Sequence, residues 1–275
     1  MSAEQSQGSG GGSAGVGSLE GKVAVVTGAG RNIGRAIALA LVEVGARVAV
    51  VDLDAAAAWR VQTELALRGA ESLAIACDVS EEAAVESMVA EVVARFGRVD
   101  ILVNNVAATD RGHTVVDLPV EEWRRIIDVT VTSAFVCSKH AARAMIRDGV
   151  RGCIVNLGST SGYLGRVNAT AYPTAKSALI GLTRSMAVQL GQFGIRVNLV
   201  APNKAGSPVG ERDVAEDRRV RNLLGRPTSP EDVARAVRFL VSDEAALVTG
   251  VDLLVDAGAV LAGDLPDPVN ALGAR

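Results

Sequence analysis

The chain is 275 residues long and 49% hydrophobic, so it can bury a full core in one large domain. Its net charge of −3, its aromatic content of 3% and the lack of any basic block argue against nucleic acid as a partner. Only two histidines are present and none of the three cysteines has metal-ligand spacing, so we expect no metal site.

The N-terminal residues 1–18 are rich in glycine and serine and have neither the basic start nor the apolar run of a signal peptide. This composition predicts a disordered tail, followed by a single domain over residues 19–275. No stretch reaches the roughly 18 uninterrupted apolar residues of a membrane span. Cys77 and Cys153 lie in apolar runs and are predicted to be small core residues in a reducing compartment. We therefore expect a soluble, cytoplasmic protein without a membrane partner.

Short β-branched runs alternate with Ala-rich amphipathic segments along the chain. The predicted strands are Val23–Thr27, Arg47–Asp52, Ser72–Cys77, Val99–Asn104, Gly152–Gly158, Ile195–Ala201 and Val251–Asp256. The clearest predicted helices are Asn32–Val44, Glu81–Phe96 and Glu231–Val241. The segment Pro227–Glu231 is typical of a helix start and indicates where the last of them begins. Strands that are apolar on both faces, such as Val23–Val26, are typical of a parallel sheet covered by helices on each side. The predicted fold class is α/β, a single doubly wound parallel sheet of about seven strands with ligands at the carboxyl ends of its strands.

The first predicted strand runs directly into a glycine-rich loop, Thr27–Gly34, and then into a helix. Glycines let the backbone turn tightly and approach a pyrophosphate, which the free N–H groups of a helix N-terminus bind. The candidate cofactor-binding residues in this loop are Gly28, Gly30, Arg31, Asn32, Ile33 and Gly34. Glycine loops are common in turns, but the position of this one between a strand and a helix favours a dinucleotide site.

Asp52 ends the second predicted strand, eighteen residues after Gly34, and Leu53 follows it. A carboxylate at this place can accept hydrogen bonds from both ribose hydroxyls of an adenosine. The alternative is that Asp52 only caps the next helix. A 2′-phosphate beside this carboxylate would cost about 4 kcal/mol for each pair of unit charges about 4 Å apart, before screening. Arg31 could offset part of this repulsion, and we favour NAD over NADP.

Three residues in the second half of the chain carry groups suited to acid–base chemistry. Ser159 follows a predicted strand, and Tyr172 and Lys176 share one helix face because they are four residues apart. Phenol has a free pKa of about 10, and a fixed ammonium beside it favours phenolate. Lowering that pKa to near 7 requires roughly 4 kcal/mol, which a close and partly desolvated charge can supply. The alternative is an exposed pair on a solvated helix face.

Together these residues resemble the classical short-chain dehydrogenase/reductase (SDR) family, over about residues 19–259 and in the order of its motifs. The catalytic serine, tyrosine and lysine of that family match Ser159, Tyr172 and Lys176, and its glycine loop matches Thr27–Gly34. The resemblance assigns further cofactor contacts to Asp78, Val79, Asn104, Asn105, Pro202, Ala205 and Ser207, in addition to Tyr172 and Lys176. It implies a Rossmann-type NAD(P)-binding domain. It also implies a homotetramer in which two long helices, Glu121–Met145 and Thr170–Phe193, pack against their symmetry mates.

Four positions depart from the family pattern. Asn32 replaces a loop glycine and must hold an unusual backbone conformation with a Cβ, which asparagine tolerates better than most residues. Val106–Ala107 replaces Ala-Gly, and Asn203 replaces a glycine. Thr130 stands where the family has an asparagine that helps to hold a proton-relay water near the lysine. We expect the Thr130 hydroxyl to bond back to its own helix, so that a main-chain carbonyl stays available for that water.

The resemblance implies reversible hydride transfer between NAD(H) and a secondary alcohol or ketone, with Tyr172 as the acid/base. One alternative is an NADPH-linked reductase of 3-oxoacyl thioesters, and another is a catalytically inactive regulator that binds NAD. The spacing of Tyr172 and Lys176 argues against related enoyl reductases, which have a longer gap. We expect a small-molecule substrate, bound by the loops 107–113, 161–168 and 204–223. Charged side chains in these loops are candidates for contact with a polar or anionic substituent: Arg111, His113, Arg166 and Lys204.

Overall fold

The apolar runs of the sequence form the strands of one parallel sheet in the computed structural model, which describes residues 17–110, 112–206 and 222–262. Seven strands in these ranges are ordered β3-β2-β1-β4-β5-β6-β7, and all neighbouring pairs are parallel. Their bounds are β1 Val23–Thr27, β2 Arg47–Asp52, β3 Ser72–Ala76, β4 Ile101–Asn104, β5 Cys153–Leu157, β6 Arg196–Pro202 and β7 Asp252–Val255. Each strand therefore lies within two residues of its predicted bounds.

The amphipathic segments between the strands form helices. Their bounds are α1 Asn32–Val42, α2 Ala55–Leu67, α3 Glu82–Phe96, α4 Val120–Ile127, α5 Ser133–Arg147, α6 Ala171–Leu190, α7 Pro230–Val241 and α8 Ala259–Ala262. A π-helical turn, Asp128–Thr132, and three 3-10 turns, Thr160–Gly162, Gly191–Phe193 and Asp243–Ala245, complete the described elements. None of the helices in the described ranges is long and apolar enough to cross a bilayer.

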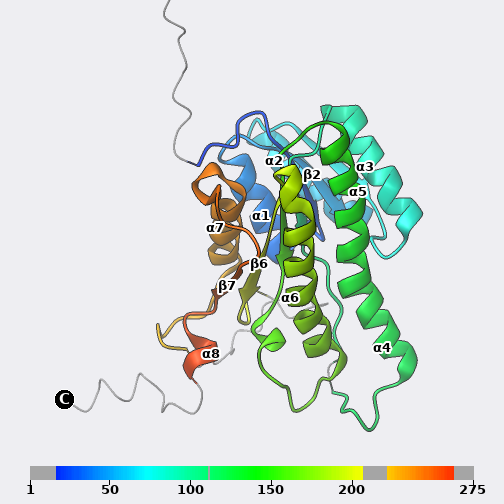
Figure 1. Cartoon of the computed structure of the whole chain (residues 1–275), viewed down its shortest axis with the longest axis vertical. Helices are drawn as coiled ribbons and strands as arrows, with labels where there is room; N and C mark the ends of the chain where they lie inside the picture. Colours follow the sequence, from blue (N-terminus) through cyan, green and yellow to red (C-terminus); the bar gives the residue numbers. More distant parts are fainter. Residues whose placement is uncertain (1–16, 111, 207–221, 263–275) are drawn as a thin grey trace, which may run out of the picture.

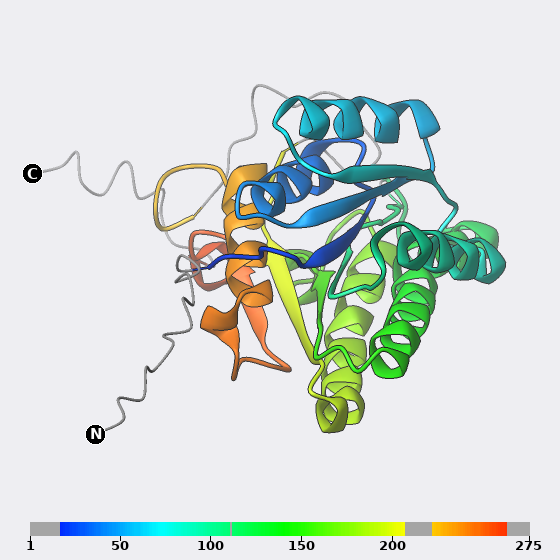
Figure 2. The same ribbon diagram turned by 90° about the horizontal axis from the view of Figure 1, so that it is seen from above.

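Helices cover both faces of the sheet, which explains why its strands are apolar throughout (Figure 1 and Figure 2). All five residues of β1 are buried. On one face α1, α2 and α7 contribute Ile37, Leu41, Val61, Leu65, Val233 and Val237 to the core. On the other face α3, α5 and α6 contribute Met88, Val92, Cys137, Met145 and Met186. The α/β class and the doubly wound sheet predicted from the sequence are thus confirmed.

The sheet order places a switch point between β1 and β4, because the chain proceeds from β1 to β2 on one side and returns to β4 on the other. Connections that leave neighbouring strands in opposite directions open a crevice at the carboxyl ends of those strands. The loops that follow β1, β4 and β5 all begin at this edge. Three of the predicted functional segments are therefore brought together by topology alone.

The cysteines are buried within this framework and form no disulfide. Cys77 and Cys153 are 6% and 3% exposed, which confirms that they are core residues. Burial raises the pKa of the Cys137 thiol to about 12 and that of Cys153 to about 11. Thiols with such raised pKa values stay protonated and react weakly. Of the predicted N-terminal tail, only residues 17 and 18 fall within the described ranges.

One predicted long helix, Glu121–Met145, is interrupted in the middle. It is divided into α4 and α5 by the π-helical turn Asp128–Thr132, where the Ser133 N–H bonds to the Asp128 carbonyl. A π turn breaks the regular i→i−4 pattern and is often found at functional sites. The interruption lies at Thr130, one of the positions singled out in the sequence.

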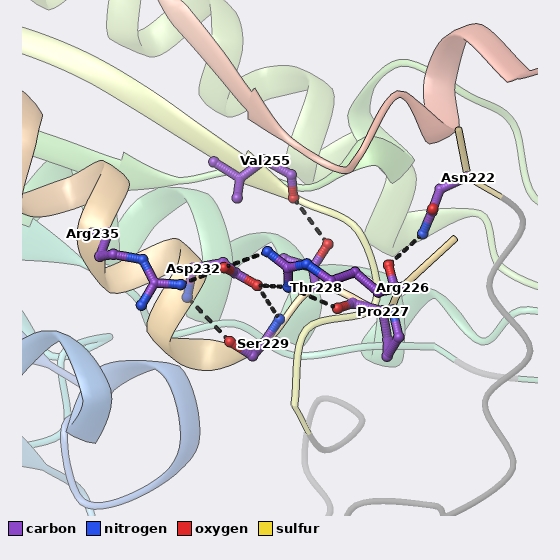
Figure 3. A network of polar contacts seen from close by, with 8 residues as sticks. All are labelled: Asn222, Arg226, Pro227, Thr228, Ser229, Asp232, Arg235 and Val255. Atoms are coloured by element: carbon purple, nitrogen blue, oxygen red, sulfur yellow. Dashed lines mark hydrogen bonds and ion pairs between the residues drawn. The ribbon is translucent and has the colours of Figure 1, made fainter. Parts of the chain in front are cut away.

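A polar network fixes the start of α7 and the segment before it (Figure 3). Ser229 and Asp232 form a capping box: the Asp232 N–H donates to Ser229 Oγ at 3.2 Å, and the Ser229 N–H donates to Asp232 Oδ2 at 2.9 Å. The Arg226 guanidinium donates to both Asp232 oxygens and holds the pKa of that carboxyl well below its usual range. Because Thr228 Oγ1 also donates to the Val255 carbonyl at 3.3 Å, the network ties this segment to the end of β7.

Candidate active site

A cleft of about 700 Å³ lies at the carboxyl ends of the strands. Most of the residues predicted to bind cofactor or substrate line it: Gly28, Arg31, Asn32, Ile33, Gly34, Asp52, Leu53, Asp78, Val79, Asn105, Ser159, Tyr172, Lys176, Pro202 and Ala205. Gly30, Asn104 and Thr130 do not line it, and Ser207 lies outside the described residues. The structure therefore brings residues from segments that are far apart in the sequence to one cleft.

The glycine loop is shaped for close packing against the start of α1. A Cβ on Gly34 would collide with the Gly28 carbonyl, so only glycine allows the helix to begin so close to the loop. Asn32 adopts a φ of 49°, which confirms that this residue holds the left-handed conformation expected of the glycine it replaces. Asn105 fixes the loop from the next strand, because its side-chain amide donates to the carbonyls of Thr27 and Gly28 at 3.0 and 3.1 Å.

Asp52 is held in place by the backbone around it. Its Oδ2 accepts from the Gly30 N–H at 2.8 Å, and its Oδ1 accepts from the Asp54 N–H at 3.0 Å. The alternative that Asp52 caps the next helix is wrong, because the N-cap of α2 is Asp54, which accepts from the Ala57 N–H at 3.1 Å. Asp52 is thus a carboxylate fixed in contact with the glycine loop.

These features fit a dinucleotide. A Cβ on Gly30 would meet both the Ala57 side chain and the Asp52 carboxylate, so glycine at this position lets the loop pass close to Asp52 and the start of α2. The first N–H groups of α1 face this loop without a side-chain cap from Arg31. The N–H groups at a helix N-terminus bind phosphate, and the carboxylate next to them suits a ribose diol.

Tyr172 and Lys176 lie near the start of α6, and both line the cleft. The Lys176 ammonium lies 5.7 Å from the centre of the Tyr172 ring, and Lys176 Nζ donates to the Leu157 carbonyl at 2.6 Å. Lys176 is only 3% exposed, so the alternative of a solvated surface pair is wrong. Burial lowers the pKa of the Lys176 amine to about 7. The lysine is therefore fixed as expected, but its surroundings oppose its positive charge.

Ser159 comes to the same cleft from the end of β5 and is 8% exposed. Its Oγ lies 3.1 Å from Ser161 Oγ and accepts from the Ser161 N–H, also at 3.1 Å. The serine is the N-cap of a short 3-10 turn, Thr160–Gly162. Arg166, in the loop that follows this turn, also lines the cleft.

Asp110 is a site residue that the sequence analysis missed. It is 1% exposed, and its carboxylate accepts from the backbone N–H groups of Thr170 and Ala171 at 2.6 Å and of Tyr172 at 3.0 Å. Thr170, the N-cap of α6, supplies no side-chain cap of its own. A residue about sixty positions away thus caps the helix that carries Tyr172, and the only signal in the sequence was an isolated aspartate in a run of small residues.

Thr130 is buried in the π turn behind the cleft and is 1% exposed. The expectation that its hydroxyl bonds back to its own helix is wrong: Thr130 Oγ1 accepts from the Ala108 N–H at 3.1 Å. The back-bond belongs to Ser133, whose Oγ donates to the Val129 carbonyl at 2.7 Å. Thr130 thereby ties the turn to the loop after β4.

Asn104 does not reach the cleft, contrary to the prediction. It is 6% exposed, and its side-chain amide donates to Ser138 Oγ and Asn156 Oδ1, each at 2.9 Å. The amide is turned into the protein between β4, α5 and β5. Its neighbour Asn105 faces the glycine loop because successive residues of a strand point to opposite sides.

Known proteins resemble this chain over most of its length. A family model described as "Enoyl-(Acyl carrier protein) reductase" matches residues 28–260. "Cis-4-hydroxycyclohexanecarboxylate dehydrogenase" of Sinomonas cyclohexanicum is 40% identical over 240 residues, which cover 86% of this chain and 96% of that protein. The NAD⁺-bound xylitol dehydrogenase structure is 33% identical, with a TM-score of 0.81 over 87% of this chain and 99% of that one. The 3-ketoacyl-(acyl-carrier-protein) reductase of Brucella melitensis, complexed with NADH, is 34% identical, with a TM-score of 0.83 over 88% of this chain and 100% of that one. The chain therefore belongs to the short-chain dehydrogenase/reductase family of oxidoreductases, whose members bind a nicotinamide cofactor.

Proposed function

We propose that this protein is an NAD-dependent dehydrogenase of a secondary alcohol, with Tyr172 as the acid/base. The observation that carries the proposal is the convergence of Ser159, Tyr172 and Lys176 on one cleft that also contains the glycine loop. Phenol, hydroxyl and ammonium groups at one place suit the removal of a proton from an alcohol oxygen. The bound nicotinamide supplies the acceptor for the hydride that leaves the carbinol carbon.

Tyr172 takes the hydroxyl proton of the alcohol as phenolate, and Ser159 donates a hydrogen bond that orients the substrate oxygen. Reduction of a ketone reverses both roles. Lys176 is held by the Leu157 carbonyl and favours the phenolate whenever it is protonated. Thr130 acts through the backbone in this proposal: the π turn that it stabilises leaves a main-chain carbonyl free to hold a water that carries protons from Lys176.

The preference for NAD over NADP rests on Asp52. Its carboxylate is fixed by the N–H groups of Gly30 and Asp54 and cannot readily turn away from a ribose in the cleft. A 2′-phosphate there would bring like charges together in a partly buried place. Arg31 lines the same end of the cleft and would become useful to a phosphate only if Asp52 were removed.

The rival activity is the reduction of 3-oxoacyl thioesters, which uses the same three side chains. Cofactor preference alone does not separate the two activities, because a 3-ketoacyl-(acyl-carrier-protein) reductase similar to this chain is complexed with NADH. The two activities are distinguished by the substrates that the enzyme turns over. We expect measurable NAD-linked oxidation within a panel of cis-4-hydroxycyclohexanecarboxylate, cyclohexanol and xylitol, and little reduction of a 3-oxoacyl thioester. Inactivity with every alcohol, together with rapid thioester reduction, would favour the rival.

The direct test of the mechanism is Tyr172→Phe, which deletes one hydroxyl and keeps the ring. We expect kcat to fall by at least about a hundredfold, within the range typical of a lost general acid or base, while the Kd of NAD stays within about twofold. Turnover measured by NADH absorbance and NAD binding measured by calorimetry check the two parts. Full activity in this variant would refute the mechanism, and a protein that binds NAD but turns over no alcohol would match the inactive regulator instead.

The assembly proposed for the protein is a homotetramer, with its helices α5 and α6 packed against symmetry mates. Phe135 on α5 and Val188 on α6 are 49% and 83% exposed, which supports an apolar contact surface on these helices. We place the enzyme in the cytoplasm because its cysteines are buried and unpaired, as suits a reducing compartment.

A further inference from the structure

We propose that Arg166 is a positioning residue that polarises the Ser159 hydroxyl through Ser161. The inference rests on the proposed function, in which Ser159 holds the substrate oxygen. The three side chains form a continuous series of hydrogen bonds: Arg166 Nε donates to Ser161 Oγ at 2.8 Å, and Ser161 Oγ lies 3.1 Å from Ser159 Oγ. We call this series the Arg166–Ser161–Ser159 relay.

The chemistry of the guanidinium gives the relay a direction. Guanidinium has N–H donors and no acceptor, so the Ser161 oxygen must act as the acceptor toward Arg166. In the structure Ser159 Oγ donates to Ser161 Oγ. Both groups are hydroxyls, so rotation of their protons reverses this bond and directs the Ser161 proton at Ser159 when a substrate oxygen accepts the Ser159 proton. The Ser161 N–H already donates to Ser159 Oγ. With two donors directed at its oxygen, Ser159 is left with its own proton for the substrate.

Burial makes this arrangement effective. Ser161 is 2% exposed and Ser159 is 8% exposed, so the hydrogen bonds between them are formed away from bulk water and polarise one another. The positive charge of Arg166 lies two hydrogen bonds from Ser159 Oγ and three from the substrate oxygen. As the phenolate of Tyr172 removes the alcohol proton, negative charge develops on that oxygen, and a donor polarised by a cation stabilises it.

Nothing in the described part of the chain neutralises Arg166. It makes no ion pair with a described carboxylate, whereas Arg125, another guanidinium that lines the cleft, is paired with both oxygens of Glu122. The third lining guanidinium, Arg31, belongs to the glycine loop. The carboxylates among the described lining residues are Asp52, which ends β2, and Asp78, which follows β3; both strands lie on the other side of β1 from β5 and Ser159. Arg166 therefore has a charge available at the substrate end, and its Nε is directed at the serine pair.

A double-mutant cycle tests the relay with a neutral substrate, cyclohexanol or xylitol, whichever the wild-type enzyme oxidises faster. We expect Arg166→Met and Ser161→Ala each to lower kcat by about tenfold, a fraction of the loss seen when a direct oxyanion donor is removed. The double variant should lose about the same, because both changes break one series of bonds. Arg166→Lys should recover most of the activity. Arg147→Gln and Ser87→Ala, exposed residues away from the cleft, are matched controls that should keep wild-type kcat.

A second measurement detects the polarising effect of the relay in a complex that does not turn over. Cyclohexanone bound together with NAD⁺ cannot be reduced, and its infrared carbonyl stretch reports how strongly a donor polarises its oxygen. We expect this stretch to lie at lower frequency in the wild-type enzyme than in Arg166→Met or Ser161→Ala.

Multiplicative losses of about a hundredfold in the double variant, or equal carbonyl frequencies in all three proteins, would overturn the relay. So would an Arg166→Met effect confined to the KM of cis-4-hydroxycyclohexanecarboxylate, which would make Arg166 a direct ligand of the substrate anion. Failure of the wild-type enzyme to oxidise any alcohol of the panel would overturn the proposed function, and the relay with it.

Discussion

Lys176 combines two properties that oppose each other at the level of a single residue. Its amine is buried beside the Leu157 carbonyl, which fixes its position, yet the same burial removes the water that stabilises an ammonium. Burial therefore lowers its pKa to about 7. A lysine in such a state carries less charge at neutral pH than one on the surface, and ligands that bring acceptors to it restore the charge.

This lowered pKa predicts a pH dependence of stability. In the unfolded chain the amine has its usual pKa near 10.4, so between about pH 7 and pH 10 the unfolded state binds more protons than the folded one. Stability contributed by this group consequently rises with pH across that window, by up to about 1.4 kcal/mol per pH unit. Lys176→Met should be more stable than wild type at pH 7, and the difference should shrink toward pH 10. Urea unfolding at several pH values measures it; Lys139→Met, an ion-paired surface lysine, should leave the wild-type slope unchanged.

Asp52 should determine the choice of cofactor. We expect Asp52→Ser to raise kcat/KM with NADP relative to NAD by at least about tenfold, since 1.4 kcal/mol corresponds to tenfold and the repulsion removed exceeds that. Adding Arg31→Ala should reverse the gain, because Arg31 is the cation beside the new phosphate. The matched control is Asp54→Ser, which removes a carboxylate two residues away, keeps a side-chain oxygen to cap α2, and should leave the ratio unchanged. An unaltered ratio in Asp52→Ser would mean that this carboxylate does not face the ribose.

At the scale of an element, the start of α6 depends on a carboxylate from another part of the chain. Three N–H groups of the first turn of a helix have no partner within the helix, and here they converge on Asp110. A negative charge is favourable at this end of a helix dipole. Because the third of these N–H groups belongs to Tyr172, the cap also fixes the backbone that carries the phenol.

Asp110→Asn should therefore damage both stability and rate. Its amide nitrogen cannot accept a hydrogen bond, so at least one N–H group of the turn is left without a partner in a buried place. We expect a loss of about 2 kcal/mol in the free energy of unfolding and a fall of roughly tenfold in kcat, with a smaller change in the Kd of NAD. Thermal unfolding and steady-state kinetics measure these. Asp117→Asn is the control, since Asp117 also accepts a backbone N–H but is exposed on a surface turn; equal effects of the two changes would show that the position of Asp110 is unimportant.

At the scale of the whole molecule, the outer surface of α5 and α6 carries exposed apolar side chains, among them Phe135 and Val188. Figure 1 shows these two long helices on the outside of the molecule, on the side of the sheet opposite α1 and α7. Obligate interfaces between subunits are more hydrophobic than the rest of a protein surface. We therefore propose that a second copy of the chain covers the exposed side chains of this surface.

We expect light scattering at micromolar concentration to give four times the chain mass of 28.3 kDa. Phe135→Asp should reduce this mass, because it places a charge at the centre of the proposed contact, where it would be buried without a partner. Leu67→Asp changes a leucine that is 85% exposed on α2, away from this surface, and should leave the mass unchanged. A wild-type monomer would rule out the tetramer.

The local features of this protein follow from its sequence because they depend on neighbouring residues. Strands that are apolar on both faces predicted the parallel sheet, and the predicted strand bounds differ from the observed ones by two residues at most. The spacing of Tyr172 and Lys176 placed both on one helix face, and the φ of 49° at Asn32 agrees with the conformation that the loop required. Backbone sterics and side-chain periodicity act over a few residues, so a linear pattern is enough to predict them.

Other features were decided only when distant segments met. Asp110 and the start of α6 are about sixty residues apart, and Thr130 bonds to the Ala108 N–H and not to its own helix. Asn104 turns into the core because β5 and α5 offer it partners there. A buried polar group must find a hydrogen-bonding partner, and which partner is nearest depends on how the helices pack on the sheet. The sequence by itself therefore determined the sheet, the glycine loop and the residues of the proposed acid–base site, whereas tertiary packing decided which side chains hold those residues in place.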